Sequence, residues 1–400
     1  MRGHIVKRGN QSWSIVLYVG RDPQTGKKQY KWHSVKGTKK QAEKELASLI
    51  NRLETGNYIK PTKITVGLFL EQWLKDYAST NTAPRTFERY AEIVRTHLIP
   101  NLGRITLTYL KPEHLQAYYT QELTSGRLNG KGGLSAQTVK HHHRVLSAAL
   151  NHAVKWGLVT RNVANAVDPP RPLKKEMATI QAEDVNQLLE EARKFEKASS
   201  IPYYALFYAA LHTGMRRGEL LALRWSDIDL ELMTISVNRS LQVLKDGTKI
   251  IREPKTPKAR RSISMTPSLA LQLREHKTSQ SALRLLNNQP VQHHHLIFSD
   301  FDGQPINPNT VTPAFSKIAK RAGLNLRLHD LRHTHATMML KAGVHPKIVS
   351  ERLGHATVAF TLDTYSHVVP GLQEAAARAF DEVLKTSPPV SEVGAAARAD

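Results

Sequence analysis

The chain has 400 residues, of which 40% are hydrophobic, and this length and content suffice for the cores of two or three domains. Its 57 Lys and Arg exceed its 34 Asp and Glu, so the formal net charge of +23 favours a polyanionic partner, with nucleic acid first. The absence of cysteine excludes disulfides, thiolate zinc sites and cysteine nucleophiles. The sequence has neither an apolar run of about eighteen residues nor an apolar signal core, so we expect a cytoplasmic protein without a membrane partner.

Residues 1–63 are strongly basic, with 14 Lys or Arg against 4 Asp or Glu. Apolar residues alternate along SWSIVLYV and again along YKWHS, and the turn signal DPQTG lies between them. This pattern predicts a small antiparallel sheet. The following segment, TKKQAEKELASLINRLE, has apolar residues at helical spacing behind a capping threonine, which predicts one helix over the sheet. A basic sheet with a helix is typical of a small DNA-binding module.

Residues 64–168 are predicted to be helical throughout. Four segments carry helical spacing and are separated by Pro or Gly: VGLFLEQWLKDYA, PRTFERYAEIVRTHLIPNLG, KPEHLQAYYTQEL and SAQTVKHHHRVLSAALNHAVKWGLV. A four-helix domain is the simplest interpretation. The proline-rich stretch that follows, PPRPLKK, cannot continue a helix, so we expect an interdomain linker over residues 169–178.

Residues 179–385 are expected to form a mixed α/β domain. Helical patterns dominate, and a short sheet is predicted from the β-branched segments MTISVNRS, TKIIREPK and RRSISM. The last residues, 386–400, are small and polar, which predicts a disordered tail. The fold class is therefore multidomain and mainly α, with small β-sheets.

Two segments of this domain carry candidate phosphate ligands. In TGMRRGEL, Arg216 stands where a turn enters a helix, a position that suits an anion, although a capping turn with solvated arginines is the plainer interpretation. In LHDLRHTH, His329 and Arg332 are three residues apart and share one helix face. His329 and His333 have the spacing of a zinc helix, but Asp330 replaces the expected glutamate and no third ligand is obvious, so we expect no metal there.

Further histidines and one tyrosine are candidate site residues, but none of them indicates a function by itself. His355 lies in LGHAT and Tyr365 in TLDTYSH, where a lone tyrosine is usually a half-buried packing residue. The histidine run 141–143, in a helix beside basic residues, is a candidate for phosphate contacts, whereas the run 293–295 resembles a loop. Neither run requires a metal.

Three segments, in this order, resemble the conserved boxes of the tyrosine recombinase (phage integrase) family: TGMRRGELLALRW, LRLHDLRHTHATMML and LGHATVAFTLDTYSHV. The resemblance implies a catalytic set with Tyr365 as the nucleophile. The family also has a lysine in a β-hairpin, for which Lys255 is the match and Lys258 the alternative. The implied catalytic residues are Arg216, Lys255, His329, Arg332, His355 and Tyr365.

The same resemblance implies a site-specific recombinase that acts without a cofactor in the bacterial cytoplasm. Such an enzyme cleaves and rejoins DNA through a 3′ phosphotyrosyl intermediate and a Holliday junction, and it would integrate and excise a phage or mobile element. The implied partners are double-stranded DNA at core and arm sites, three further copies of the chain in a tetramer, and a host DNA-bending or directionality factor. Residues 1–63 would bind arm sites, residues 64–168 the core site, and residues 179–385 would catalyse.

These residue types suit phosphoryl transfer. Arginine forks hold the non-bridging oxygens and remain charged, while a histidine accepts the phenolic proton. The sequence leaves open whether His329 or His355 is this base. A hairpin lysine, Lys255 by the resemblance, protonates the leaving 5′ oxygen. Glu219 is expected to support Arg216, or else to interact with the helix dipole, and His333 to support Arg332.

Two other functions compete with this one. A topoisomerase-like enzyme would use the same residues to relax DNA without exchanging partners, and a DNA-binding regulator would carry an idle site. The apolar stripe of GLQEAAARAFDEVL would either pack on its own domain or exchange between subunits, and the second interpretation favours recombination. The complete catalytic set argues against the regulator.

Overall fold

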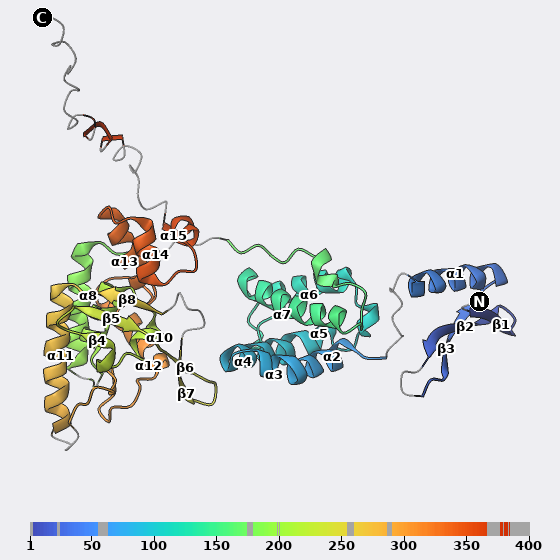
Figure 1. Ribbon diagram of the computed structural model, residues 1–400, viewed down its shortest axis with the longest axis horizontal. Helices are drawn as coiled ribbons and strands as arrows, with labels where there is room; N and C mark the ends of the chain where they lie inside the picture. Colours follow the sequence, from blue (N-terminus) through green and yellow to red (C-terminus); the bar gives the residue numbers. More distant parts are fainter. Residues whose placement is uncertain are drawn as a thin grey trace, which may run out of the picture. The chain divides into compact units, whose positions relative to one another are not determined.

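The computed structural model divides into two compact units, Met1–Lys174 and Lys175–Asp400, and each is described by itself (Figure 1). The structure describes residues 3–21, 25–54, 63–173, 179–197, 199, 201–253, 260–285, 290–365, 377–378, 380–382 and 384. Lys255, Lys258, most of the predicted tail helix and the tail 386–400 lie outside the described residues. No helix within the described ranges is long and apolar enough to cross a membrane.

The first unit begins with an antiparallel sheet in the order β1-β2-β3, followed by one helix. Ile15 and Leu17 are fully buried on one face of the sheet, where they pack with Leu49 of the helix because the alternation places them on the same side. The predicted sheet and helix are confirmed, and the first strand is an addition. The elements are β1 (Gly3–Gly9), β2 (Ser12–Arg21), β3 (Lys28–Lys36) and α1 (Lys39–Glu54).

The other face of this sheet remains open within the part of the unit that the structure describes. Tyr30 and Trp32 of β3 are 48% and 58% exposed, and the Arg8 guanidinium lies 5.3 Å from the centre of the Trp32 ring. Tyr18 contacts Tyr30 at a ring distance of 5.6 Å. The sheet thus presents aromatic and basic side chains together on the face opposite α1.

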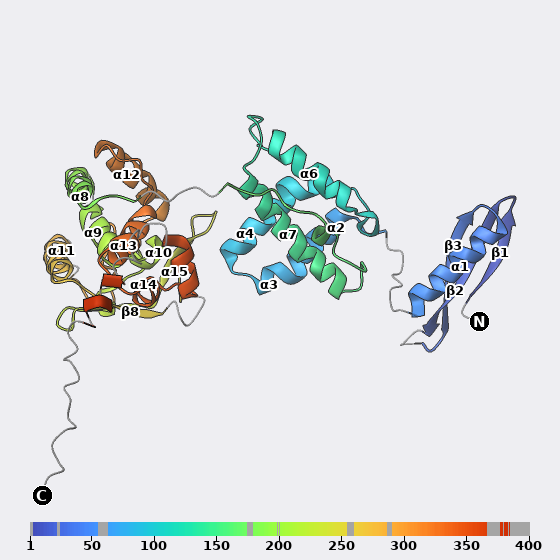
Figure 2. The ribbon, with the colours of Figure 1, turned by 90° about the horizontal axis from the view of Figure 1, so that it is seen from above.

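The rest of the first unit is helical, and the four predicted helical segments are present (Figure 2). The first two segments are continuous runs in which a π-helical stretch joins two α-helices. Phe69, Trp73, Leu98, Leu115 and Leu146 belong to one buried core that all four segments share. The elements are α2 (Val66–Trp73), η1 (Leu74–Ala78), α3 (Ser79–Asn81), α4 (Pro84–Ile93), η2 (Val94–Leu98), α5 (Ile99–Leu102), η3 (Leu107–Tyr109), α6 (Pro112–Ser125), α7 (Ala136–Lys155) and η4 (Val163–Ala166).

The second unit is mainly helical around a small sheet (Figure 1). Its core is centred on Phe207 and Phe315, whose rings meet edge to face at 5.1 Å and are fully buried. The helices are α8 (Ala182–Glu196), α9 (Tyr203–Thr213), α10 (Arg217–Leu220), η5 (Trp225–Asp227), α11 (Pro267–Leu285), α12 (Pro308–Arg321), α13 (Asp330–Lys341), α14 (Pro346–Leu353) and α15 (Val358–Tyr365).

The predicted short sheet is present, but its strands fall into two sheets. One has the order β4-β5-β8, and the other is the hairpin β6-β7. Pairing of Ile235 with Ile263 buries both side chains under the helices. The strands are β4 (Ile228–Asp229), β5 (Thr234–Val237), β6 (Ser240–Val243), β7 (Lys249–Arg252) and β8 (Arg261–Ser264).

The burial of Phe315 gives a test of this core. Phe315→Ala should destabilise the second unit by about 3–5 kcal/mol, because it removes a fully buried ring and leaves a cavity. Hydrogen exchange followed by mass spectrometry should show the protected amides of α12 exchanging roughly a hundredfold faster or more. Phe301→Ala, at a position that is 50% exposed, is the control and should change little. Equal effects of the two variants would contradict the assigned core.

Candidate active site

Arg216 and Glu219 are joined at the first turn of α10. The Arg216 guanidinium donates to Glu219 Oε1 at 2.9 Å, and its backbone N–H donates to Oε2 at 3.0 Å. Arg261 of β8 donates to the same Oε2 at 2.8 Å. Burial opposes ionisation of Glu219, but the two guanidinium groups outweigh it and hold the pKa of this carboxyl below its usual range. Sequence reasoning missed Arg261, because nothing in its neighbourhood marks it as different from the adjacent basic residues.

Arg332 is held by the carboxyl ends of two helices. Its guanidinium donates to the carbonyls of Gly214, just after α9, and Leu353, at the end of α14, each at 2.7 Å. Arg216 donates to the neighbouring carbonyl of Gly354 at 3.3 Å. Because unsatisfied carbonyls at helix ends favour cations, this geometry places two positive charges side by side. Burial and the charge of Arg216 lower the pKa of Arg332 to about 9, so it stays charged at neutral pH.

The turn at Gly214 is specific to glycine. Its φ of +63° lies in the left-handed region, and an added Cβ would come within 2.7 Å of Leu353 and His335 side-chain atoms. This tight contact brings the end of α9 against α13 and α14. The carbonyl that Arg332 requires is positioned by the same turn.

Tyr365 is the last residue of α15 and is only 1% exposed. Its Oη lies 2.8 Å from Nδ1 of His333, and burial raises the pKa of the phenol to about 12 although Arg332 acts in the opposite direction. Its ring also stacks on that of His355 at 6.5 Å. The phenol therefore faces the interior of the site.

Three histidines surround the phenol and the arginines. His333 and His329 contact each other edge to face, with ring centres 4.9 Å apart. Burial lowers the pKa of His333 to about 4 and that of His355 to about 3, and it also lowers the pKa of His329. At neutral pH all three rings are therefore neutral. His355 Nδ1 lies 2.8 Å from Thr361 Oγ1, whereas His333 Nδ1 contacts the Tyr365 oxygen.

Arg216, His329 and Arg332 line one cavity of about 450 Å³. The structure therefore brings together five of the six implied catalytic residues, with Glu219 and His333, in the second unit. The sixth, Lys255, and its alternative Lys258 lie outside the described residues. The described donors around the cavity are cationic or neutral, an arrangement that suits an anion such as a phosphodiester.

The histidine run 141–143 does not act as one DNA-facing set. His142 is 1% exposed and contacts Tyr118 Oη at 2.8 Å, so the expectation of phosphate contacts is wrong for this residue. His143 contacts Tyr119 Oη at 2.7 Å. One side of α7 must face the core, and the run spans both sides of it. The run 293–295 lies in a turn between α11 and α12.

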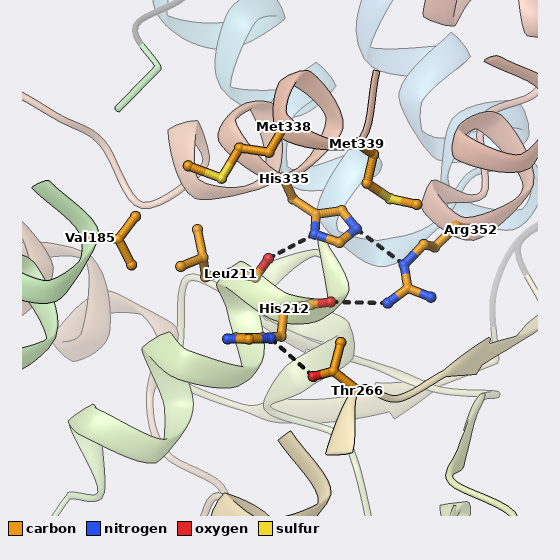
Figure 3. A pocket seen from close by; sticks show the side chains of 8 residues that line it. All are labelled: Val185, Leu211, His212, Thr266, His335, Met338, Met339 and Arg352. Carbon is orange, nitrogen blue, oxygen red and sulfur yellow. Dashed lines mark hydrogen bonds between the residues drawn. The ribbon is translucent and has the colours of Figure 1, made fainter. Parts of the chain in front are cut away.

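A second hydrogen-bond network involves His335 and Arg352 (Figure 3). His335 donates from Nδ1 to the Leu211 carbonyl at 2.8 Å and accepts at Nε2 from Arg352 Nε at 3.1 Å. Arg352 also donates to the carbonyls of His212 and Ser264. We call His335 and Arg352 the clamp, because the pair ties α13 and α14 to the end of α9 and to β8. The clamp borders an otherwise largely apolar cavity of about 370 Å³.

The comparisons with known proteins cover both units. Residues 178–370 match the model of the Phage integrase family, residues 65–123 match its N-terminal SAM-like domain, and residues 4–53 match the Arm DNA-binding domain. A tyrosine recombinase XerC-like protein of Caldanaerobacter subterraneus is 30% identical over 91% of this chain and 94% of its own length. The ICEBs1 integrase of Bacillus subtilis is 26% identical over 95% of this chain and 100% of its own.

Solved structures share the fold. The Tn1549 transposon integrase in complex with transposon right end DNA has a TM-score of 0.64 and 21% identity, covering 80% of this chain and 99% of that one. The lambda integrase tetramer bound to a Holliday junction has a TM-score of 0.56 and 19% identity, covering 90% and 94%. The chain belongs to the tyrosine recombinase (phage integrase) family. It is a site-specific recombinase, an enzyme that acts on DNA by breaking and rejoining its strands.

The clamp makes the second unit sensitive to acid. Burial and the charge of Arg352 lower the pKa of His335 to about 3, from 6.5 in an unfolded chain. As the pH falls below 6.5, this histidine is protonated in the unfolded chain but not in the folded chain. The free energy of unfolding therefore decreases until the pH reaches about 3, where the folded chain also binds the proton. The His335→Asn variant should bind about one proton fewer than the wild type when it unfolds near pH 5. Its melting temperature should therefore decrease less steeply as the pH is lowered.

The control for the clamp is His294→Asn, which changes an exposed histidine in the same unit. It should leave the pH dependence as in the wild type. A slope that is the same in His335→Asn as in the wild type would contradict a buried, neutral His335.

Proposed function

We propose that Tyr365 is the nucleophile of this recombinase. Its Oη attacks the phosphorus of a backbone phosphodiester, the bond from phosphorus to the 5′ oxygen breaks, and a 3′ phosphotyrosyl bond forms. The phenolic proton passes to a histidine, and the leaving 5′ oxygen takes up a proton, which the family resemblance assigns to Lys255. Attack by the 5′ hydroxyl of another strand reverses the step and rejoins the DNA. The observation that carries the proposal is the 2.8 Å contact between the Tyr365 oxygen and a neutral histidine beside Arg332.

We assign the proton acceptor to His333. The sequence left His329 and His355 as alternatives, but the Nδ1 atom nearest the phenol belongs to His333, and the ring is neutral at physiological pH. A base must lie within hydrogen-bond reach of the proton that it takes, and the tautomer with a hydrogen on Nε2 leaves Nδ1 free to accept. His329 and His355 would then hydrogen-bond the phosphate.

Arg216 and Arg332 would hold the two non-bridging phosphate oxygens. Both guanidinium groups are fixed before DNA arrives, by Glu219 and by helix-end carbonyls, so little reorganisation is needed when negative charge grows in the transition state. Because Tyr365 is 1% exposed, we infer that binding of DNA turns α15 to bring Oη to the phosphorus. Glu219 acts through the arginines as a positioning residue.

We propose that three parts of the chain contact DNA. Residues 1–63 would bind arm sites through the open sheet face, where Arg8, Tyr30 and Trp32 offer a cation and stacking surfaces. Residues 64–168 would bind the core site, and residues 179–385 would catalyse. Names of relatives, among them the ICEBs1 integrase, support integration and excision of a mobile element or phage. A tetramer on DNA and a host DNA-bending or directionality factor complete the proposal.

The first test is covalent trapping. Wild-type protein incubated with suicide-nicked DNA that carries its attachment site should give an SDS-resistant protein–DNA adduct, and Tyr365→Phe should give none, because the variant lacks the attacking oxygen. Tyr204→Phe is the matched control, since it removes another hydroxyl of the second unit and keeps the ring under Arg193. A wild-type chain that binds the DNA without an adduct would favour the regulator.

The same adduct in Tyr365→Phe would place the nucleophile elsewhere. Relaxation of a plasmid that lacks attachment sites, without recombinant products from one that carries them, would favour the topoisomerase-like enzyme.

The assignment of His333 has a separate test. His333→Gln should slow adduct formation by roughly a hundredfold or more, because glutamine cannot accept the proton. A substrate with a sulfur in place of the bridging 5′ oxygen has a leaving group that needs no proton. This substrate should restore the rate of adduct formation in Lys255→Ala, which lacks the proposed acid, but should leave the rate in His333→Gln slow. His329→Gln and His355→Gln serve as comparisons. Rescue of His333→Gln by the sulfur substrate would show that His333 is not the base.

A further inference from the structure

Three metal-ligand side chains meet inside the helical part of the first unit, far in sequence from the catalytic motifs. His97 comes from η2, Glu122 from α6 and His142 from α7. Their side chains are 12%, 4% and 2% exposed. We call these three residues the His–Glu cluster. The family boxes and the proposed chemistry make no use of it.

The distances suit a small tetrahedral ion. Glu122 Oε2 lies 2.9 Å from His97 Nδ1 and 3.8 Å from His142 Nδ1, and the ligand atoms of the cluster lie within 4.8 Å of one another. Zinc bonds to nitrogen and oxygen of about 2.0–2.1 Å separate neighbouring ligand atoms in a tetrahedron by about 3.4 Å. Shifts of a few tenths of an ångström would therefore bring the histidine nitrogens and the carboxylate oxygen around one ion.

One oxygen of the carboxylate faces both histidines. Asn101 donates to Glu122 Oε1 at 3.2 Å, which fixes the group, while the buried Oε2 has His97 Nδ1 as its ion-pair neighbour at 2.9 Å without a hydrogen bond of regular geometry. A buried carboxylate is costly unless a proton or a cation lies beside it. His142 Nδ1 contacts Tyr118 Oη at 2.8 Å, a contact that an ion at this nitrogen would replace.

We propose that the His–Glu cluster binds a divalent transition-metal ion of the zinc class. Neutral imidazole nitrogens with one carboxylate are a donor set that this class prefers. Tyr118 Oη lies 2.8 Å from His142 Nδ1, close enough to hydrogen-bond a water in a fourth ligand position. The ion would join η2, α6 and α7, and it would brace the helices that we propose to hold the core site. Catalysis by Tyr365 does not depend on it.

The test uses the full-length chain after removal of metal with a chelator. Titration with Co²⁺ should produce the visible absorption of a tetrahedral site at one equivalent, and Zn²⁺ should displace it. Glu122→Gln and His142→Asn should lose this absorption. Their matched controls, Glu113→Gln on the exposed side of α6 and His141→Asn beside His142 on α7, should keep it.

Two further measurements make the outcome decisive. Circular dichroism should show the variants folded, and if one is not, His97→Asn takes its place. Zn²⁺ should slow hydrogen exchange in α6 and α7 of the wild type and not of Glu122→Gln. Wild-type protein without the absorption, or with absorption that persists in both cluster variants, would overturn the proposal, because the cluster would then hold a proton shared by His97 and Glu122. Adduct formation after metal removal tests Tyr365 independently.

Discussion

The candidate site of the second unit depends on holding the buried guanidinium groups of Arg261 and Arg332 beside the partly exposed one of Arg216. Arg216 and Arg261 pair with one carboxylate, that of Glu219, and Arg332 interacts with the same charge from farther away, so positive charge remains in excess. Like charges at such distances repel, and burial adds a desolvation cost. The carbonyls of Gly214, Leu353 and Gly354 offset part of this cost. A phosphate of DNA would supply the missing negative charge and so neutralise the excess positive charge of this cluster.

Much of the surrounding architecture serves this charge cluster. The helices α9 and α14 end at left-handed glycines, Gly214 and Gly354, so that their terminal carbonyls turn toward the arginines. The clamp of His335 and Arg352 keeps those two ends fixed to α13 and β8. The same burial that adds a desolvation cost to the arginines also keeps the histidines neutral. The low exposure of the site thus governs both the neutral histidines and the buried Arg332, to which we assign phosphate binding.

The first unit places its polar side chains in two different environments, one exposed and one buried. Its sheet leaves basic and aromatic side chains on an open face, where they remain available to a charged polymer. Its helical part instead buries a carboxylate between two histidines, and such a group is stable only with a cation or a proton beside it. In the first case the partner would come from solution as DNA. In the second it would be an integral part of the folded helices.

The sequence by itself determined the class of the protein and most of its candidate site. Motifs of a few residues fix which side chains share a helix face, as they do for His329 and Arg332. The resemblance of three ordered motifs to the tyrosine recombinase family implied the roles of Arg216 and Tyr365. Local patterns also gave the sheet with its helix and the four helical segments. Alternation in a strand and the helical period in a helix show which face of the element is apolar. These patterns can be read from the sequence because each lies within a single element.

Only the tertiary structure decided which residues meet. The contact of Tyr365 with His333 joins residues 32 positions apart, and that of Arg216 with Gly354 joins residues 138 apart. The partner of Glu219 on β8 and the burial of His142 likewise depend on how whole elements pack. A periodic pattern cannot specify such pairs, because packing is settled by the shapes and charges of several elements at once.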